Sequence, residues 1–174
     1  IIIPRKTIGE LRKLIEDIDG NINLYISDTK IKFEVTNISL TSKLIDGTFP
    51  DYERVIPKTN TKIMSVKTSE FASSIDRVGT ISSDKSKAVK FLIKDNSLTL
   101  TVTNPDTGTA VEKLDVIYDS DDLEVGFNAR YLLDIASQVD GDTMTFTLED
   151  AGAPALINDS AHKDATYVLM PMRV

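Results

Sequence analysis

A threefold recurrence along the chain limits the folds that this sequence can adopt. Thr7, Thr68 and Asn128 are residue types that favour helix N-termini, and they stand 61 and 60 residues apart. Each follows a short apolar stretch and precedes a segment with apolar residues at helical spacing. About three segments of alternating polarity come after it. The pattern predicts a βαβββ unit, repeated two and a half to three times with a period near 60 residues.

Hydrophobic periodicity places the expected helices and strands. The helices are expected at about residues 8–18, 69–80 and 129–139, and Thr7 with Glu10 fits a capping box at the first of them. The strands are expected at residues 22–26, 31–35, 38–41, 98–102, 123–127 and 144–148. Short polar turns separate neighbouring strands, which is typical of antiparallel hairpins. The sequence therefore predicts an α+β fold.

One stretch breaks this rhythm and predicts a domain boundary. Residues 44–57 lack clean alternation and hold Gly47, Pro50 and Pro57. Two complete units follow the break and one precedes it, so we expect domains at residues 1–50 and 51–174. A lone βαβββ unit leaves one flank of its sheet unpaired. We therefore expect the chain to be the C-terminal part of a longer protein.

Composition argues against most enzymatic chemistry. The 174 residues include no cysteine and one histidine, which excludes disulfides, thiolate catalysis, most zinc sites and any two-histidine metal motif. His162 lies in a polar turn, and no nucleophile motif accompanies it. The acidic run at residues 119–122 lacks the glycine and distal glutamate of a calcium loop. We expect no catalytic residues, no metal and no cofactor.

The charge of −7 is unevenly distributed. Residues 1–99 hold 16 Lys and Arg against 13 Asp and Glu, and residues 100–174 hold 4 against 14. The total suggests a poor nucleic-acid binder. However, cations gather at the expected helices and acids at the expected strands. Two interpretations remain open: helices that face a polyanion, or an ordinary solvated helix surface.

The last nine residues stay largely apolar to the end. Two interpretations remain open: a final core strand, or an edge that binds peptide segments. Pro171 cannot donate a ladder hydrogen bond, and Met170 and Met172 flank it, which favours the adaptable binding edge.

Several strings, taken in order, resemble the bacterial β sliding clamp family. They are residues 3–6, 41–47, 49–52, 126–128 with Tyr131, and 167–168 with 170–173. The resemblance covers the whole chain and implies the second half of the middle clamp domain at residues 1–50 and the third domain at residues 51–174. It implies a DNA clamp fold of repeated βαβββ units, with antiparallel sheets outside and helices lining a DNA channel.

The resemblance also implies a function and its residues. It implies a non-catalytic cytoplasmic processivity factor that closes as a homodimeric ring around double-stranded DNA without sequence preference. Such a protein would tether the replicative polymerase and clamp loader through linear motifs, with no membrane role. The implied DNA-channel residues are Arg5, Lys6, Arg12, Lys13 and Lys87. The implied ring-interface residues are Thr80, Ile81, Asp106 and Glu112. The implied peptide pocket comprises Pro50, Arg54, Val55, Asn128, Tyr131, Gly152, Pro154, Val168, Leu169, Met170, Pro171, Met172 and Arg173.

Two other functions remain as alternatives. One is an enzyme whose active site lies partly in absent N-terminal residues, and the other is a non-enzymatic β-rich scaffold.

Overall fold

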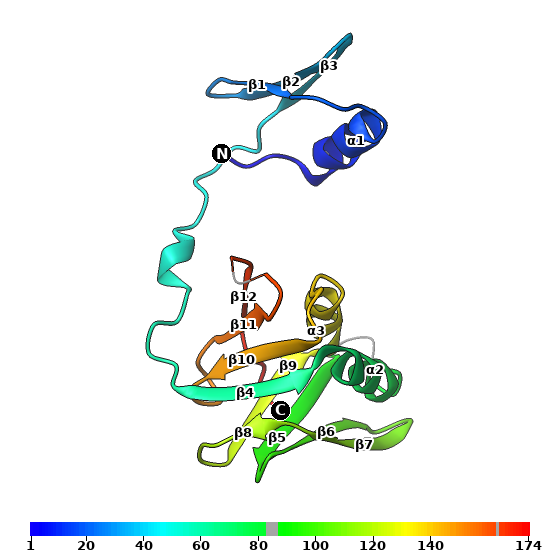
Figure 1. Cartoon of the computed structure of the whole chain (residues 1–174), viewed down its shortest axis with the longest axis vertical. Coiled ribbons are helices and arrows are strands. Elements are labelled where there is room, and N and C mark those ends of the chain that lie inside the picture. Colours follow the sequence, from blue (N-terminus) through cyan, green and yellow to red (C-terminus); the bar gives the residue numbers. More distant parts are fainter. Residues whose placement is uncertain (83–86, 163) are drawn as a thin grey trace. The chain divides into compact units, whose positions relative to one another are not determined.

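The chain divides into two compact units, Ile1–Asp51 and Tyr52–Val174. The structure is a computed structural model that describes residues 1–82, 87–162 and 164–174. Figure 1 shows the helices and strands of both units. We call Ile1–Asp51 the first unit and Tyr52–Val174 the second unit.

The first unit is a helix on a small antiparallel sheet. Helix α1 (Arg5–Ile15) precedes β1 (Asn23–Ile26), β2 (Lys30–Val35) and β3 (Ile38–Lys43), which pair in the order β1-β2-β3. The β2 side chains of Ile31, Phe33 and Val35 are buried, because alternate residues of a strand face the same side of a sheet. A 2.7 Å hydrogen bond between the Thr7 and Ser42 hydroxyls joins α1 to β3.

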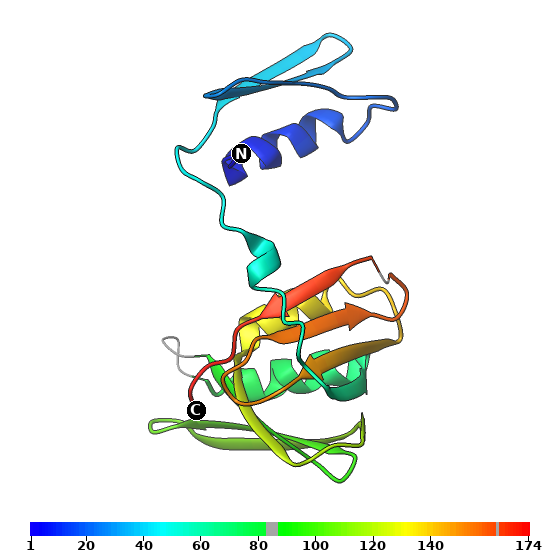
Figure 2. The same ribbon diagram turned by 90° about the vertical axis from the view of Figure 1, so that its left-hand side faces the viewer.

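In its described residues, the second unit contains a 3₁₀ helix, two α-helices and two antiparallel sheets. A 3₁₀ helix, η1 (Tyr52–Arg54), comes first, and two helices follow, α2 (Thr68–Gly79) and α3 (Ala129–Ala136). The strands are β4 (Lys62–Lys67), β5 (Ala88–Lys94), β6 (Ser97–Asn104), β7 (Gly108–Asp115), β8 (Ile117–Tyr118), β9 (Leu123–Asn128), β10 (Thr143–Leu148), β11 (Ala155–Asp159) and β12 (Thr166–Leu169). Helices α2 and α3 pack against each other, and Figure 2 shows the orange and red strands β10–β12 in front of them.

The strand before each helix pairs in the sheet of the other repeat. One sheet has the order β12-β11-β10-β4-β8 and the other β7-β6-β5-β9. Strand β4, which leads into α2, therefore pairs with β10, and β9, which leads into α3, pairs with β5. Because each half supplies a strand to its neighbour, neither half completes a sheet alone.

One hydrophobic core lies within the second unit. Strands β5, β6 and β10 alternate between buried and partly exposed residues, as expected for half-buried strands. Four fully buried phenylalanines, Phe71, Phe91, Phe127 and Phe146, meet with ring centroids 5.2–6.4 Å apart. They come from α2, β5, β9 and β10, so this cluster joins both repeats.

The predicted α+β class is confirmed, but two of the three predicted helix caps are wrong. Helix α1 begins at Arg5 after Pro4, so Thr7 lies within the first turn and bonds to Ser42 instead. Helix α2 begins at Thr68 itself, whose hydroxyl donates to the Gly141 carbonyl across the unit. In both cases the tertiary contact takes the hydroxyl that a cap would use.

Candidate peptide-binding and nucleic-acid surfaces

An apolar hollow of about 360 Å³ lies between α3 and the end of β12. Tyr131 and Met170, both more than half exposed, are among the residues at this hollow. The full lining is Tyr131, Asp134, Ile135, Val168, Leu169 and Met170. A short apolar segment of another chain would remove these exposed side chains from water, which is the usual driving force for such binding.

Hydrogen bonds at the start of α3 and strand pairing with β11 position the two walls of the hollow. The Asn128 side chain accepts a 2.9 Å bond from the Arg130 N–H, which makes Asn128 the N-cap of α3, as predicted. On the other wall, Leu169 pairs with Ala155 in β11. The chain then leaves the sheet, and the Met172 N–H donates 2.8 Å to the Gly126 carbonyl in β9. Strand β9 leads directly into α3, the helix that contains Tyr131. The same strand therefore also anchors the segment after Met170.

The structure unites four of the thirteen predicted pocket residues in this hollow: Tyr131, Val168, Leu169 and Met170. It adds Asp134 and Ile135, which the sequence reasoning missed. Their spacing from Tyr131, three and four residues along α3, is the signal that could have found them.

The other predicted pocket residues lie around the hollow or away from it. Gly152 and Pro154 lie in the β10–β11 connection, where Asp150 accepts the Gly152 N–H at 2.7 Å. The N–H groups of Gly152 and Ala153 lower the pKa of the Asp150 carboxyl.

Arg173 lines a different hollow of about 290 Å³ beside β5 and β6. The remaining residues are Pro50 in the first unit, Arg54 in η1, Val55 directly after η1, Asn128 at the α3 cap, and Pro171 and Met172 after β12.

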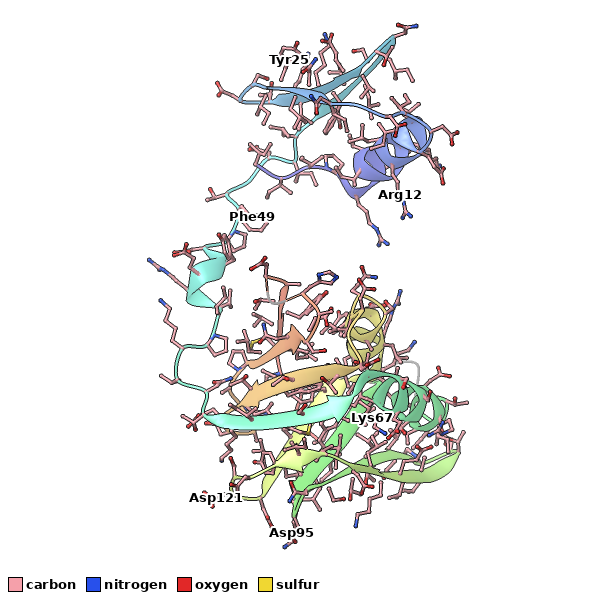
Figure 3. The ribbon with its side chains drawn as sticks, viewed as in Figure 1. Arg12, Tyr25, Phe49, Lys67, Asp95 and Asp121 are labelled. Carbon is pink, nitrogen blue, oxygen red and sulfur yellow. The ribbon has the colours of Figure 1, made fainter. Side chains whose placement is uncertain are left out.

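Helix α1 presents the predicted basic residues to solvent. Arg5, Lys6, Arg12 and Lys13 are all exposed, as expected for the side opposite Thr7. Figure 3 shows Arg12 projecting from α1 away from the sheet of the first unit. Lys13 forms a 3.2 Å ion pair with Glu10 at the helix surface. The exposed cations can meet a polyanion without desolvating a buried charge.

A second basic position lies in the second unit, between the end of α2 and the start of α3. Lys87 and Arg130 line a hollow of about 400 Å³ there, together with Thr80 and one acidic residue, Asp76. The Lys87 carbonyl accepts a 2.8 Å bond from the Ala129 N–H at the start of α3, which fixes the backbone beside the helix.

The predicted ring-interface residues lie at two places. Thr80 and Ile81 follow α2. The Ile81 carbonyl accepts bonds from Asn104 at the end of β6 and from Thr107 in the β6–β7 turn, which also holds Asp106. Glu112 lies on β7, where the Arg77 guanidinium binds its two oxygens at 2.6 and 2.7 Å. That contact lowers the pKa of the Glu112 carboxyl.

Asp159, a buried carboxylate of the second unit, has hydrogen-bond partners that stabilise its charge. Asp159 accepts N–H groups from Ala161 at 2.7 Å, Asp140 at 3.0 Å and Gly141 at 3.1 Å, and these bonds lower its pKa. His162 contacts Asp140 at 3.1 Å at the exposed end of this turn. In the described parts of the chain, no group of His, Asp and Glu side chains suits a metal ion. No described helix is long and apolar enough to cross a membrane.

Comparison with known proteins identifies the family. Residues 53–173 match the family model of the DNA polymerase III beta subunit, C-terminal domain, and residues 1–51 match that of its central domain. The chain belongs to the bacterial β sliding clamp family. The beta sliding clamp of Caulobacter vibrioides is 47% identical over all 174 residues, and that of Escherichia coli K12 is 34% identical. The chain spans about half the length of these curated relatives, 47% and 48%.

Solved sliding clamps have the same fold. A DnaN sliding clamp from Bartonella birtlesii bound to griselimycin superposes with a TM-score of 0.96 at 52% identity, over all of this chain and 47% of that one. A Pseudomonas aeruginosa DNA polymerase III subunit beta gives 0.94 at 32% identity, over 99% of this chain and 47% of that one. The predicted clamp fold and family are therefore confirmed.

Proposed function

We propose that this chain supplies part of a processivity clamp for bacterial DNA replication. Residues 1–50 would form the second half of the middle domain, and residues 51–174 the third domain. The family match over the whole chain is the observation that carries this proposal. The clamp acts without catalysis, and the sliding-clamp relatives that match over the whole chain support this over an enzyme fragment.

The proposed partner of the helices is double-stranded DNA. The exposed cations of α1, with Lys87 and Arg130 beside α3, supply positive charge for phosphates. Because phosphates are the same at every base pair, such contacts carry no sequence preference. A homodimeric ring that encircles the duplex, with Thr80, Ile81, Asp106 and Glu112 at its interface, would hold the clamp on DNA while leaving it free to slide.

The proposed occupant of the hollow is a short linear motif of the polymerase or clamp loader. Five of the six lining residues present largely apolar side chains, from α3, β12 and the residue after β12, and Asp134 is the polar member. The Bartonella birtlesii clamp was solved with griselimycin bound, which supports a ligand-binding role for clamps of this fold. Exchangeable partners suit an affinity in the micromolar range, about −8 kcal/mol. Arg54, Val55, Pro171 and Met172 are proposed to extend the contact surface.

Met170→Ala is expected to weaken peptide binding by about tenfold, which is about 1.4 kcal/mol. Met170 is 56% exposed in the free chain, and its side chain would be buried by the peptide. The measurement is fluorescence anisotropy of a labelled Gln-Leu-x-Leu-Phe peptide against the 174-residue chain. Ile117→Ala is the matched control, because Ile117 is an exposed apolar residue of β8 outside the hollow. Equal affinities of the Met170 variant and the unchanged chain would reject the hollow as the peptide site.

Arg5→Ala combined with Lys6→Ala is expected to shorten retention on DNA of a full-length ring that carries this sequence. The logarithm of the DNA-binding constant falls linearly with the logarithm of the salt concentration, and each lost phosphate contact reduces this slope by about 0.9. The double variant is therefore expected to reduce the slope by about 2. Retention on closed circular DNA is measured at rising salt. Lys58→Ala with Lys94→Ala is the control, because it removes the same charge from exposed positions away from the helices. Identical slopes for the two double variants would contradict a DNA-facing α1.

A further inference from the structure

The walls of the apolar hollow are tied together at both ends. At the first end, the Met172 N–H bonds to the Gly126 carbonyl of β9, the strand that leads into α3. At the second end, Asp159, the last residue of β11, bonds both to the loop after α3 and to the turn before β12. One side chain therefore joins the two elements that form the walls.

The Asp159 carboxylate is buried, only 3% exposed, and binds segments on both sides of it. One of its oxygens accepts the N–H groups of Ala161 and Gly141, at 2.7 and 3.1 Å, and the other accepts that of Asp140, at 3.0 Å. A buried carboxylate is costly unless it is well bonded, and hydrogen bonds to a charged acceptor are stronger than those to a neutral one. The joint is therefore strong, and its loss leaves backbone donors without their acceptor.

Both segments that Asp159 binds are attached to the walls. After α3, the N–H groups of Ser137, Gln138 and Val139 bond to carbonyls of the helix, which extends its last turn into the loop. Before β12, the Asn158 side-chain amide donates to the hydroxyl of Thr166, the first residue of that strand, at 3.3 Å. A shift at the joint would therefore move α3 relative to β12.

The joint is also closely packed around Gly141. A Cβ at this position would lie 2.9 Å from the Ala161 nitrogen and against the Asp159 carboxylate, so the two segments approach as closely as a glycine permits. The Gly141 carbonyl accepts the Thr68 hydroxyl at 2.8 Å. The position of the loop after α3 therefore depends on Asp159 on one side and on Thr68 on the other.

We propose that Asp159 is a positioning residue of the peptide site, which sets the separation of α3 and β12 and with it the width of the hollow between Tyr131 and Met170. The proposal rests on the proposed function, since it requires the hollow to bind a linear motif. It adds a residue that does not line the hollow. Binding groups must be held to within about 0.5 Å by the residues that support them, so a loosened joint weakens binding while every lining side chain stays present.

Asp159→Asn is expected to weaken binding of the labelled Gln-Leu-x-Leu-Phe peptide by about fivefold. Asparagine has one acceptor oxygen, so in either orientation its NH₂ group faces a backbone N–H. Asp150→Asn is the matched control and should keep full affinity, because Asp150 also accepts two N–H groups, but both lie within its own turn, at Gly152 and Ala153. Anisotropy is measured where circular dichroism shows every variant to be fully folded, so that a change in global stability alone leaves the affinity unchanged.

Two further measurements test the joint in other ways. Gly141→Ala leaves the charge in place but pushes the two segments apart, and it should also weaken peptide binding. The ε-methyl NMR resonance of Met170 needs no peptide. It should shift in Asp159→Asn, whereas that of Met64, fully buried on β4, should not.

The outcomes separate this role from the proposed function. If the peptide failed to bind the unchanged chain, the hollow would lose its proposed function and Asp159 its role there. If the peptide bound the unchanged chain and Asp159→Asn equally, the hollow would keep its function and Asp159 would not position it. An equal loss of affinity in Asp150→Asn would also overturn the proposal, because the effect would then follow from removing any bonded carboxylate.

Discussion

Phe91→Ala is expected to lower the free energy of unfolding of the second unit by about 3–5 kcal/mol, because it leaves a cavity in a closely packed core. Phe91 is 0% exposed and lies at the centre of the aromatic cluster. Its ring centroid is 6.0 Å from Phe71, 5.2 Å from Phe127 and 6.4 Å from Phe146. These rings belong to both repeats. Loss of the Phe91 ring should therefore weaken the packing between the two repeats as well as the packing of β5.

Chemical denaturation of the whole chain, followed by circular dichroism, measures this change. Phe91→Leu is the matched control, since it keeps an apolar side chain and should cost clearly less. Leu92→Ala tests the face of the strand, because Leu92 is the neighbouring residue on the exposed side, 38% accessible. If Phe91→Ala cost no more than Leu92→Ala, the cluster would not hold the two repeats together.

Local patterns were sufficient for much of the fold. The alternation at residues 98–102 and 144–148 correctly predicted β6 and β10, and Asn128 correctly predicted the cap of α3. The exchange of β4 and β9 between the halves could not be predicted from local patterns. The paired strands lie far apart in the sequence, and their pairing depends on tertiary packing. The alternating pattern of a strand is the same whichever sheet it joins.

The wrong caps have the same origin. Thr7 and Thr68 are good capping residues in isolation, but Ser42 and Gly141 bind their hydroxyls in the folded chain. Capping preference is worth about 1 kcal/mol, which a tertiary hydrogen bond can match.

The candidate site was predictable in part. Tyr131 and the residues 168–170 came from the resemblance, and the structure brings them together in one hollow. The resemblance implied Arg173 as a pocket residue as well. However, the chain turns toward β9 after Pro171, which carries Arg173 to a different hollow beside β5.

Gly126→Ala is expected to detach the C-terminal segment and to lower the unfolding free energy by about 1–3 kcal/mol through overpacking. A Cβ at Gly126 would lie 2.6 Å from the Met172 carbonyl oxygen and against the Val174 side chain, and a backbone oxygen can move away only if the segment moves. The Met172 N–H bond to the Gly126 carbonyl, 2.8 Å, would then break. Since this bond anchors the chain after Met170, we expect weaker peptide binding in the same variant.

Gly79→Ala is the control for this change, because a Cβ there meets the Ala129 Cβ at 3.6 Å, an ordinary contact, within helix α2. In a helix, Gly→Ala gains about 0.5–1 kcal/mol, so the control should be neutral or stabilising. Denaturation midpoints and peptide anisotropy, measured on both variants, separate the two effects. If Gly126→Ala lost stability but kept full peptide affinity, Met170 would hold its position without the Met172 bridge, and the hollow would depend on α3 and the β11–β12 pairing alone.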